Sequence, residues 1–111
     1  IKTPNLDSLA LGGVVLEQYY VQPVCTPSRA SFMTGRYPFR YGLQHHVIQA
    51  GHDSGLFLNE TLIPEKLKGA GYMNHAVGKW HLGMCSWKHT PTFRGFDSYF
   101  GFYGGGEDYY T

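Results

Sequence analysis

Residues 25–36, CTPSRASFMTGR, decide how the rest of the sequence is interpreted. Thr26-Pro27 has the pattern of a helix N-cap followed by the first helical residue, and Gly35 suits the left-handed position that follows the end of a helix. We therefore expect a helix capped by Thr26 that runs from Pro27 to about Met33, with the cysteine at the loop-to-helix junction. Such a junction presents free backbone N–H groups and the positive end of the helix dipole, which together favour an anion.

Patterns on both sides of this stretch alternate between helix and strand. The expected order is a helix opened by Thr3-Pro4 and ended by Gly12-Gly13, a strand over residues 14–21, the helix above, a loop over 37–60, a helix over 64–68, a strand over 72–80 and an irregular tail over 84–111. Helices that alternate with strands indicate an α/β layered architecture.

Composition excludes several classes of protein. The 111 residues fit one domain, but only 15% are charged, against about 25% in a typical globular chain. With 15 glycines and 16% aromatic residues as well, the composition suggests the interior of something larger. The net charge of +1 gives no basic stripe for nucleic acid, and no apolar run approaches the roughly 18 residues of a transmembrane segment. The chain begins at Ile1 without Met, so we expect its natural N-terminus and any targeting signal to lie outside it.

Cys25 allows several interpretations. Arg29 and Arg36 add positive charge near it, which favours a thiolate and a tetrahedral oxyanion. A cysteine phosphatase would need Arg at the sixth position after the cysteine, where Ser31 stands. A zinc site built from both cysteines and the six His lacks paired ligand spacing. A disulfide to Cys85 is arithmetically possible, and a buried structural cysteine is the usual fate of a lone Cys.

Two motifs resemble the signatures of the sulfatase family. Residues 25–29 (CTPSR) followed by 34–36 (TGR) resemble the first signature, and 78–83 (GKWHLG) resemble the second. The flanking segments 3–9 (TPNLDSL) and 94–97 (RGFD) are similar as well, so the resemblance covers essentially the whole chain. Within the family, the chain most resembles the arylsulfatase B branch, judging from residues 20–23, 42–45 and 107–110.

This resemblance implies a fold and an activity. The fold would be an alkaline-phosphatase-like sulfatase domain, a mixed sheet flanked by helices, of which residues 1–111 form an incomplete N-terminal catalytic-domain fragment. The activity would be hydrolysis of sulfate esters, either aryl sulfates or glycosaminoglycan sugars such as N-acetylgalactosamine-4-sulfate. The protein would then be lysosomal or extracellular. The sequon Asn59-Glu60-Thr61, a glycosylation acceptor, agrees with the secretory pathway.

The resemblance also implies roles for individual residues. Cys25 would be oxidised to formylglycine by formylglycine-generating enzyme and would be a ligand of one calcium ion. Arg29 would steady the formylglycine hydrate and the metal site, while Lys79 and His81 would bind the sulfate and the leaving oxygen. Residues i and i+2 of a strand face the same side, so Trp80 would point away. The remaining histidines match no functional position and are expected to be structural or on the surface: His45, His46, His52, His75 and His89.

The chain departs from the family in its metal ligands. Calcium takes about 6–8 oxygen ligands, and the only position here that matches one is Cys25. The branch's cysteine partners are missing from residues 48–59, so Cys85 is expected to be unpaired. The alternative is therefore a non-catalytic sulfatase-derived fragment or pseudoenzyme, and we expect the isolated 111-residue chain to be inactive.

Overall fold

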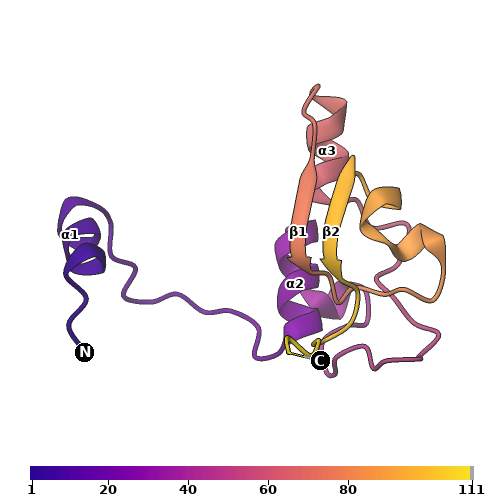
Figure 1. Ribbon diagram of the computed structural model, residues 1–111, viewed down its shortest axis with the longest axis horizontal. Helices are drawn as coiled ribbons and strands as arrows, with labels where there is room; N and C mark the ends of the chain where they lie inside the picture. Colours follow the sequence, from indigo (N-terminus) through magenta and orange to yellow (C-terminus); the bar gives the residue numbers. More distant parts are fainter. Residues whose placement is uncertain (111) are drawn as a thin grey trace.

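The computed structural model describes residues 1–110. It contains helices α1 (Pro4–Gly12), α2 (Cys25–Thr34) and α3 (Ile63–Gly69), strands β1 (His75–Lys79) and β2 (Ser98–Phe102), and 3-10 turns at Pro38–Arg40, Trp87–His89 and Pro91–Phe93 (Figure 1). Helices and strands occur together, which confirms the α/β class. Among the described residues, no helix combines the length and hydropathy that a membrane crossing demands.

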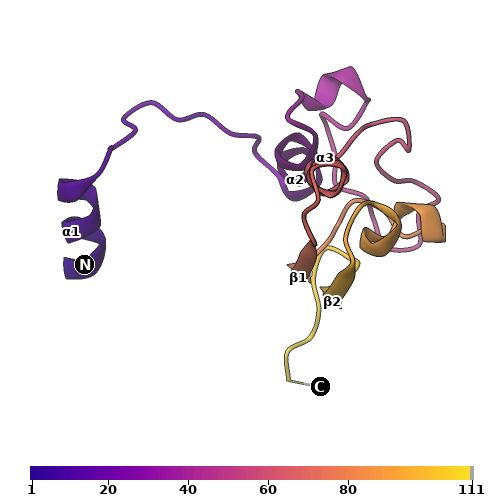
Figure 2. The ribbon, with the colours of Figure 1, turned by 90° about the horizontal axis from the view of Figure 1, so that it is seen from above.

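The sheet consists of β1 and β2, which pair in parallel from His75 beside Ser98 to Lys79 beside Phe102. Both α2 and α3 lie on one face of it (Figures 1 and 2). The expectation of an irregular tail over 84–111 was therefore wrong, because β2 lies within it. Its sequence, SYFGF, has aromatic residues at positions 99, 100 and 102, which fall on both faces of the strand, so no polar face alternates with an apolar one.

β1 is shorter than the strand expected over 72–80. The buried Asn74 donates from its side-chain amide to the carbonyls of Pro64, at 2.9 Å, and Gly95, at 3.0 Å. The backbone N–H of Tyr72 donates to Leu67 O at 3.0 Å. These bonds tie residues 72–74 to α3, so the strand begins only at His75.

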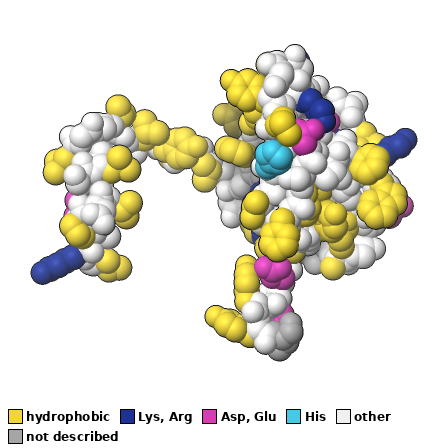
Figure 3. Space-filling model, turned by 45° about the horizontal axis from the view of Figure 1, so that its top comes forward, with side chains coloured by type: hydrophobic (Ala, Val, Ile, Leu, Met, Phe, Trp, Pro, Cys, Tyr) yellow, Lys and Arg dark blue, Asp and Glu magenta, His cyan; other side chains and the backbone are white. Residues whose placement is uncertain are grey.

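A long arm, residues 13–24, leads from α1 to α2 and holds α1 away from the rest of the molecule (Figure 1). The strand expected over residues 14–21 was wrong: within the described part of the chain, no strand lies beside them. A sequence rich in Val and Tyr favours a strand, but a strand also needs a neighbour for its backbone hydrogen bonds. Hydrophobic side chains are spread along the arm (Figure 3), and those that are exposed include Val14, Val15, Leu16, Tyr19, Tyr20 and Val21.

The hydrophobic core lies between α2, α3 and the sheet and centres on Trp80. The ring of Trp80 meets Phe96 edge to face at 6.2 Å, and its indole N–H donates to His89 O at 2.9 Å. The other fully buried members are Ala30, Tyr41, Leu56, Leu62 and Leu82. Because Trp80 stands between Lys79 and His81, the core fixes the backbone from which both of these side chains project.

The RGFD segment, residues 94–97, has a structural role. Arg94 is buried and donates to Glu60 O at 2.7 Å and to the carboxylate of Glu65 at 3.1 Å. Asp97 accepts from the Lys68 ammonium at 2.7 Å and from the Asn74 N–H at 2.8 Å. The segment thus fastens the start of β2 to α3 and to the loop that precedes α3.

Candidate active site

α2 begins at Cys25, two residues earlier than expected, and its N-cap is Val24 instead of Thr26. The Ser28 hydroxyl lies within hydrogen-bond distance of the carbonyls of Gln22, at 2.8 Å, and Val24, at 2.7 Å, and its one proton, donated to either, holds the end of the arm against the first turn. Thr26 does not cap the helix, because its hydroxyl bonds to residues far along the chain. Cys25 lies at this helix start, the junction that the sequence predicted, and it is exposed, so it is not a buried structural cysteine.

Arg29 ties α2 to the end of β1. Its guanidinium donates from Nε to Trp80 O at 2.6 Å and from Nη2 to Lys79 O. Burial lowers the pKa of Arg29 below its ordinary value, while the nearby Cys25 raises it. Arginine stays protonated in proteins, so this contact leaves a fixed positive charge close to Cys25 and beneath the backbone of residues 79–80.

Lys79 and His81 both meet Gly105. The Lys79 ammonium donates to Gly105 O at 2.6 Å, and a Cβ atom at position 105 would lie 2.8 Å from Cε1 of His81. The two side chains therefore share a neighbour, and Trp80 points into the core. Strand alternation does not produce this arrangement, because β1 ends at Lys79 and His81 has a left-handed backbone with φ of 57°.

His81 is held by its backbone and by its ring. Its N–H donates to Tyr103 O at 3.0 Å, and Nε2 lies 2.9 Å from Ile48 O. A carbonyl can only accept, so the proton of the neutral ring is on Nε2. Nδ1 then carries a lone pair, and this buried atom has no hydrogen-bond partner among the described residues.

Burial lowers the pKa of His81. The hydrogen bond to Ile48 acts in the opposite direction, and the positive charges of Lys79 and Arg29 lower the pKa further. At neutral pH the ring is therefore neutral, with Nδ1 able to accept a proton. The strained backbone conformation of a non-glycine residue at this place also marks His81 as a candidate functional residue.

Both cysteines are free thiols exposed to solvent. The Sγ atom of Cys85 lies 3.4 Å from Nδ1 of His89. The structure thus does not join Cys25 to Cys85, and Cys25 remains open to modification.

The described residues do not fit a complete metal site. No group of three or more His, Cys, Asp or Glu side chains converges among residues 1–110. Near the start of α2 lie Arg29, whose charge acts on Cys25, and the segment of Lys79 and His81, and these side chains offer nitrogen atoms and positive charge. Calcium requires about 6–8 oxygen ligands, so the expected calcium ion stays a prediction, and the described residues do not form the alternative zinc site either.

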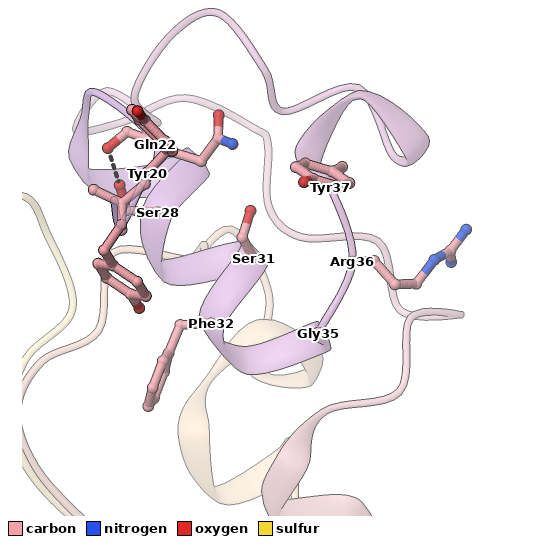
Figure 4. A pocket seen from close by; sticks show the side chains of 10 residues that line it. Tyr20, Gln22, Ser28, Ser31, Phe32, Gly35, Arg36 and Tyr37 are labelled. Carbon is pink, nitrogen blue, oxygen red and sulfur yellow. Dashed lines mark hydrogen bonds between the residues drawn. The ribbon is translucent and has the colours of Figure 1, made fainter. Parts of the chain in front are cut away.

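A groove of about 420 Å³ lies between the arm and α2, away from this cluster (Figure 4). Ser28, Ser31 and Arg36 contribute polar groups to it. Cys25, Arg29, Lys79 and His81 are not among its lining residues, so this groove is not the candidate active site. Its apolar lining includes Tyr19, Tyr20, Phe32 and Tyr37.

Asn59 lies apart from these residues, exposed in the turn in which the Glu60 N–H donates to Phe57 O at 3.1 Å. Its exposure would allow a glycan, and its glycosylation stays a prediction. Glu60, the next residue, is buried and binds Arg36 at 2.6 Å, which fixes the backbone beside the turn.

Three residues of the cluster were not predicted from the sequence: Thr26, Ile48 and Gly105. The run of glycines at 104–106 was the only available signal, because a glycine often marks a close approach of backbone to a side chain. Ile48 takes part through its backbone alone, and a backbone group carries no sequence signature.

In the full native protein, Gly105→Ala is expected to lower the activity of this site by about 10-fold or more, because the added methyl group would displace the His81 ring or the segment that binds Lys79. Gly106→Ala is the matched control, since a Cβ there meets nothing within 4 Å. Steady-state kinetics of the two variants of the full native protein test this. Equal activity of Gly105→Ala and Gly106→Ala would show that the close contact is unimportant.

Comparisons with known proteins show which family the chain resembles. The family model described as Sulfatase matches residues 1–111. Arylsulfatase J of Mus musculus is 54% identical over 111 residues, which are 100% of this chain and 19% of that protein. N-acetylgalactosamine-6-sulfatase of Mus musculus is 42% identical over 112 aligned positions, which cover 90% of this chain and 21% of that protein.

A solved structure is also similar to this chain, in both sequence and fold. Ps i-CgsB in complex with k-i-k-neocarrahexaose superimposes with a TM-score of 0.85 and 42% identity, over 96% of this chain and 24% of that one. The chain therefore spans about a fifth of the length of mouse arylsulfatase J, of which it covers 19%. The arylsulfatase B branch stays a prediction within these relatives. With a family model matched from the first residue to the last, the chain belongs to the sulfatase family.

Proposed function

We propose that the protein hydrolyses sulfate esters with a formylglycine derived from Cys25 as its nucleophile. Membership of the sulfatase family supports the reaction class. One observation carries the assignment to this place in the chain: Arg29 and Thr26 of α2 bind the backbone of Lys79, Trp80 and His81. These bonds bring the helix start that bears Cys25 to the segment that bears the Lys-His pair.

The covalent cycle runs in two steps. One hydroxyl of the hydrated aldehyde attacks sulfur, the bond from sulfur to the alcohol oxygen breaks, and the alcohol leaves with a proton. The second hydroxyl then loses its proton, the carbon–oxygen bond to sulfate breaks, and the aldehyde forms again. Addition of water restores the hydrate, so the sum is ester plus water giving alcohol, sulfate and a proton.

The side chains around Cys25 suit these steps. The Lys79 ammonium would stabilise the negative sulfate oxygens, and it would exchange its bond to Gly105 O for one to the substrate. Nδ1 of His81 would hold the proton that moves between the nucleophile and the leaving oxygen. Arg29, with its nitrogens fixed by backbone carbonyls, would act as a stationary positive charge.

Aryl sulfates or sulfated sugars are the proposed substrates, with N-acetylgalactosamine-4-sulfate as the specific candidate. The names of the relatives, an arylsulfatase and an N-acetylgalactosamine-6-sulfatase, support these two classes. We further propose a lysosomal or extracellular protein that is modified by formylglycine-generating enzyme and carries a glycan on Asn59. Residues 1–111 would be one part of its catalytic domain.

The test uses the full native protein, co-expressed with formylglycine-generating enzyme. We expect it to release 4-methylumbelliferone from 4-methylumbelliferyl sulfate, and sulfate from N-acetylgalactosamine-4-sulfate. Release from the aryl sulfate alone would support the reaction and reject the sugar. No release from either ester by fully modified protein would reject the proposed reaction.

The alternative is a non-catalytic fragment or pseudoenzyme, and the lack of a convergent metal-binding cluster in residues 1–110 favours it for the isolated chain. We therefore expect the purified 111-residue chain to release no 4-methylumbelliferone, with or without calcium. The full native protein is the positive control in the same fluorescence assay. Calcium-dependent release by the isolated chain would show that these residues suffice.

A further inference from the structure

Thr26, directly after Cys25, is fully buried, and its hydroxyl is bound on both sides. It donates to His81 O at 3.2 Å and accepts from the N–H of Ile48 at 3.1 Å. One hydroxyl supplies one donor and can accept as well, so a single side chain joins α2 to two segments far along the chain.

The Ile48 backbone completes a closed ring of contacts. While its N–H binds Thr26, its carbonyl accepts from Nε2 of His81 at 2.9 Å. Thr26 therefore holds the main chain of His81 directly and its imidazole through Ile48. The rest of this loop has few such constraints, because residues 44–46 and 49–54 are exposed.

We infer that Thr26 is a positioning residue for His81: its hydroxyl holds the Ile48 carbonyl against Nε2, which leaves the Nδ1 lone pair for proton transfer. This inference rests on the proposed role of His81. Without the hydroxyl, the half-buried Ile48 N–H and the buried His81 C=O would lose their partner, and an unsatisfied buried group is costly. The loop would then move until water reached these groups, and the carbonyl that selects the tautomer would leave the ring.

Thr26, the second residue of the CTPSR motif, thus has a role of its own that is separate from that of the nucleophile Cys25. A helix N-cap would be the ordinary role of a threonine at such a place, but Val24 is the N-cap here. Thr26 instead connects the start of α2 to the catalytic histidine across the end of β1.

The test compares Thr26→Val and Thr26→Ser in the full native protein, in otherwise wild-type and His81→Ala backgrounds. Val keeps the shape of threonine without its hydroxyl, and Ser keeps the hydroxyl. Activity on 4-methylumbelliferyl sulfate is divided by the formylglycine content measured by mass spectrometry, because residue 26 adjoins the modified position. We expect Thr26→Val to lower kcat by about 10- to 100-fold with little change in KM, and Thr26→Ser to keep most of the activity.

The double-mutant cycle distinguishes a positioning role from a merely structural one. Once His81 is Ala, Thr26→Val should cause no further loss. An equal loss in both backgrounds, or wild-type kcat in Thr26→Val, would overturn the inference. Undiminished activity of His81→Ala by itself would instead reject the proposed role of His81.

If Cys25 of the Thr26→Val variant is not converted to formylglycine, its kinetics cannot be compared, and a crystal structure of the variant tests the inference instead. We expect the Ile48 carbonyl to have left Nε2 of His81. An unchanged contact between these two atoms would overturn the inference.

Discussion

Cys25→Ala in the full native protein is expected to lower hydrolysis of 4-methylumbelliferyl sulfate by about 10⁴-fold or more, which is the scale seen when a catalytic nucleophile is removed. Alanine supplies neither a thiol for conversion nor a hydroxyl for attack. The loss should appear in kcat, because the neighbours that would bind sulfate, Lys79 and Arg29, remain held by backbone carbonyls.

Cys85→Ala is the matched control for this variant. Cys85 is also a free and exposed cysteine, and it lies beside His89. We expect wild-type kinetics from it. If the two alanine variants lost activity equally, a general need for thiols would explain the result better than a nucleophile at Cys25.

Lys79→Met should lower kcat/KM for the same substrate by about 10²- to 10³-fold, since an ammonium that stabilises developing negative charge contributes on this scale. Methionine keeps the length of the side chain and removes its charge. It also removes the bond to Gly105 O, so the segment after β2 loses one fixed point.

Lys88→Met tests whether loss of any nearby charge suffices. Lys88 lies in the 3-10 turn Trp87–His89, is exposed, and also stands beside a tryptophan and near a histidine. We expect no change in kcat/KM from it. A similar loss in both variants would point to long-range electrostatics, which added salt would suppress.

Local signals predicted the helices well. Pro4 and Gly12 bound α1 as expected, and Gly35 has the left-handed φ of 66° that ends α2. Such signals depend on the backbone preferences of single residues, which are present in the sequence itself.

Strands were predicted less well, because a strand is defined by its partner. Residues 14–21 have the composition of a strand and no neighbour, whereas 98–102 have a weak pattern and pair with β1 along their whole length. At one pair in this ladder both residues are glycine, Gly78 and Gly101, and a Cβ on Gly101 would collide with the backbone of Gly78.

The motifs identified the candidate functional side chains, but the sequence did not reveal the contacts that hold them in place. Arg29, Lys79 and His81 could be named from the motifs, and the structure brings them to the start of α2. The contacts that hold them run mainly to backbone carbonyls, of Trp80, Gly105 and Ile48. Every residue has such a carbonyl, so only the fold determines which of them is used.

The most direct test of the central claim is the mass of the peptide that contains Cys25, taken from the full native protein after co-expression with formylglycine-generating enzyme. We predict a peptide in which the thiol-bearing carbon has become an aldehyde, lighter by the loss of one sulfur and two hydrogen atoms and the gain of one oxygen. The same peptide carrying an intact thiol, from a folded protein that nevertheless hydrolyses sulfate esters, would contradict the account.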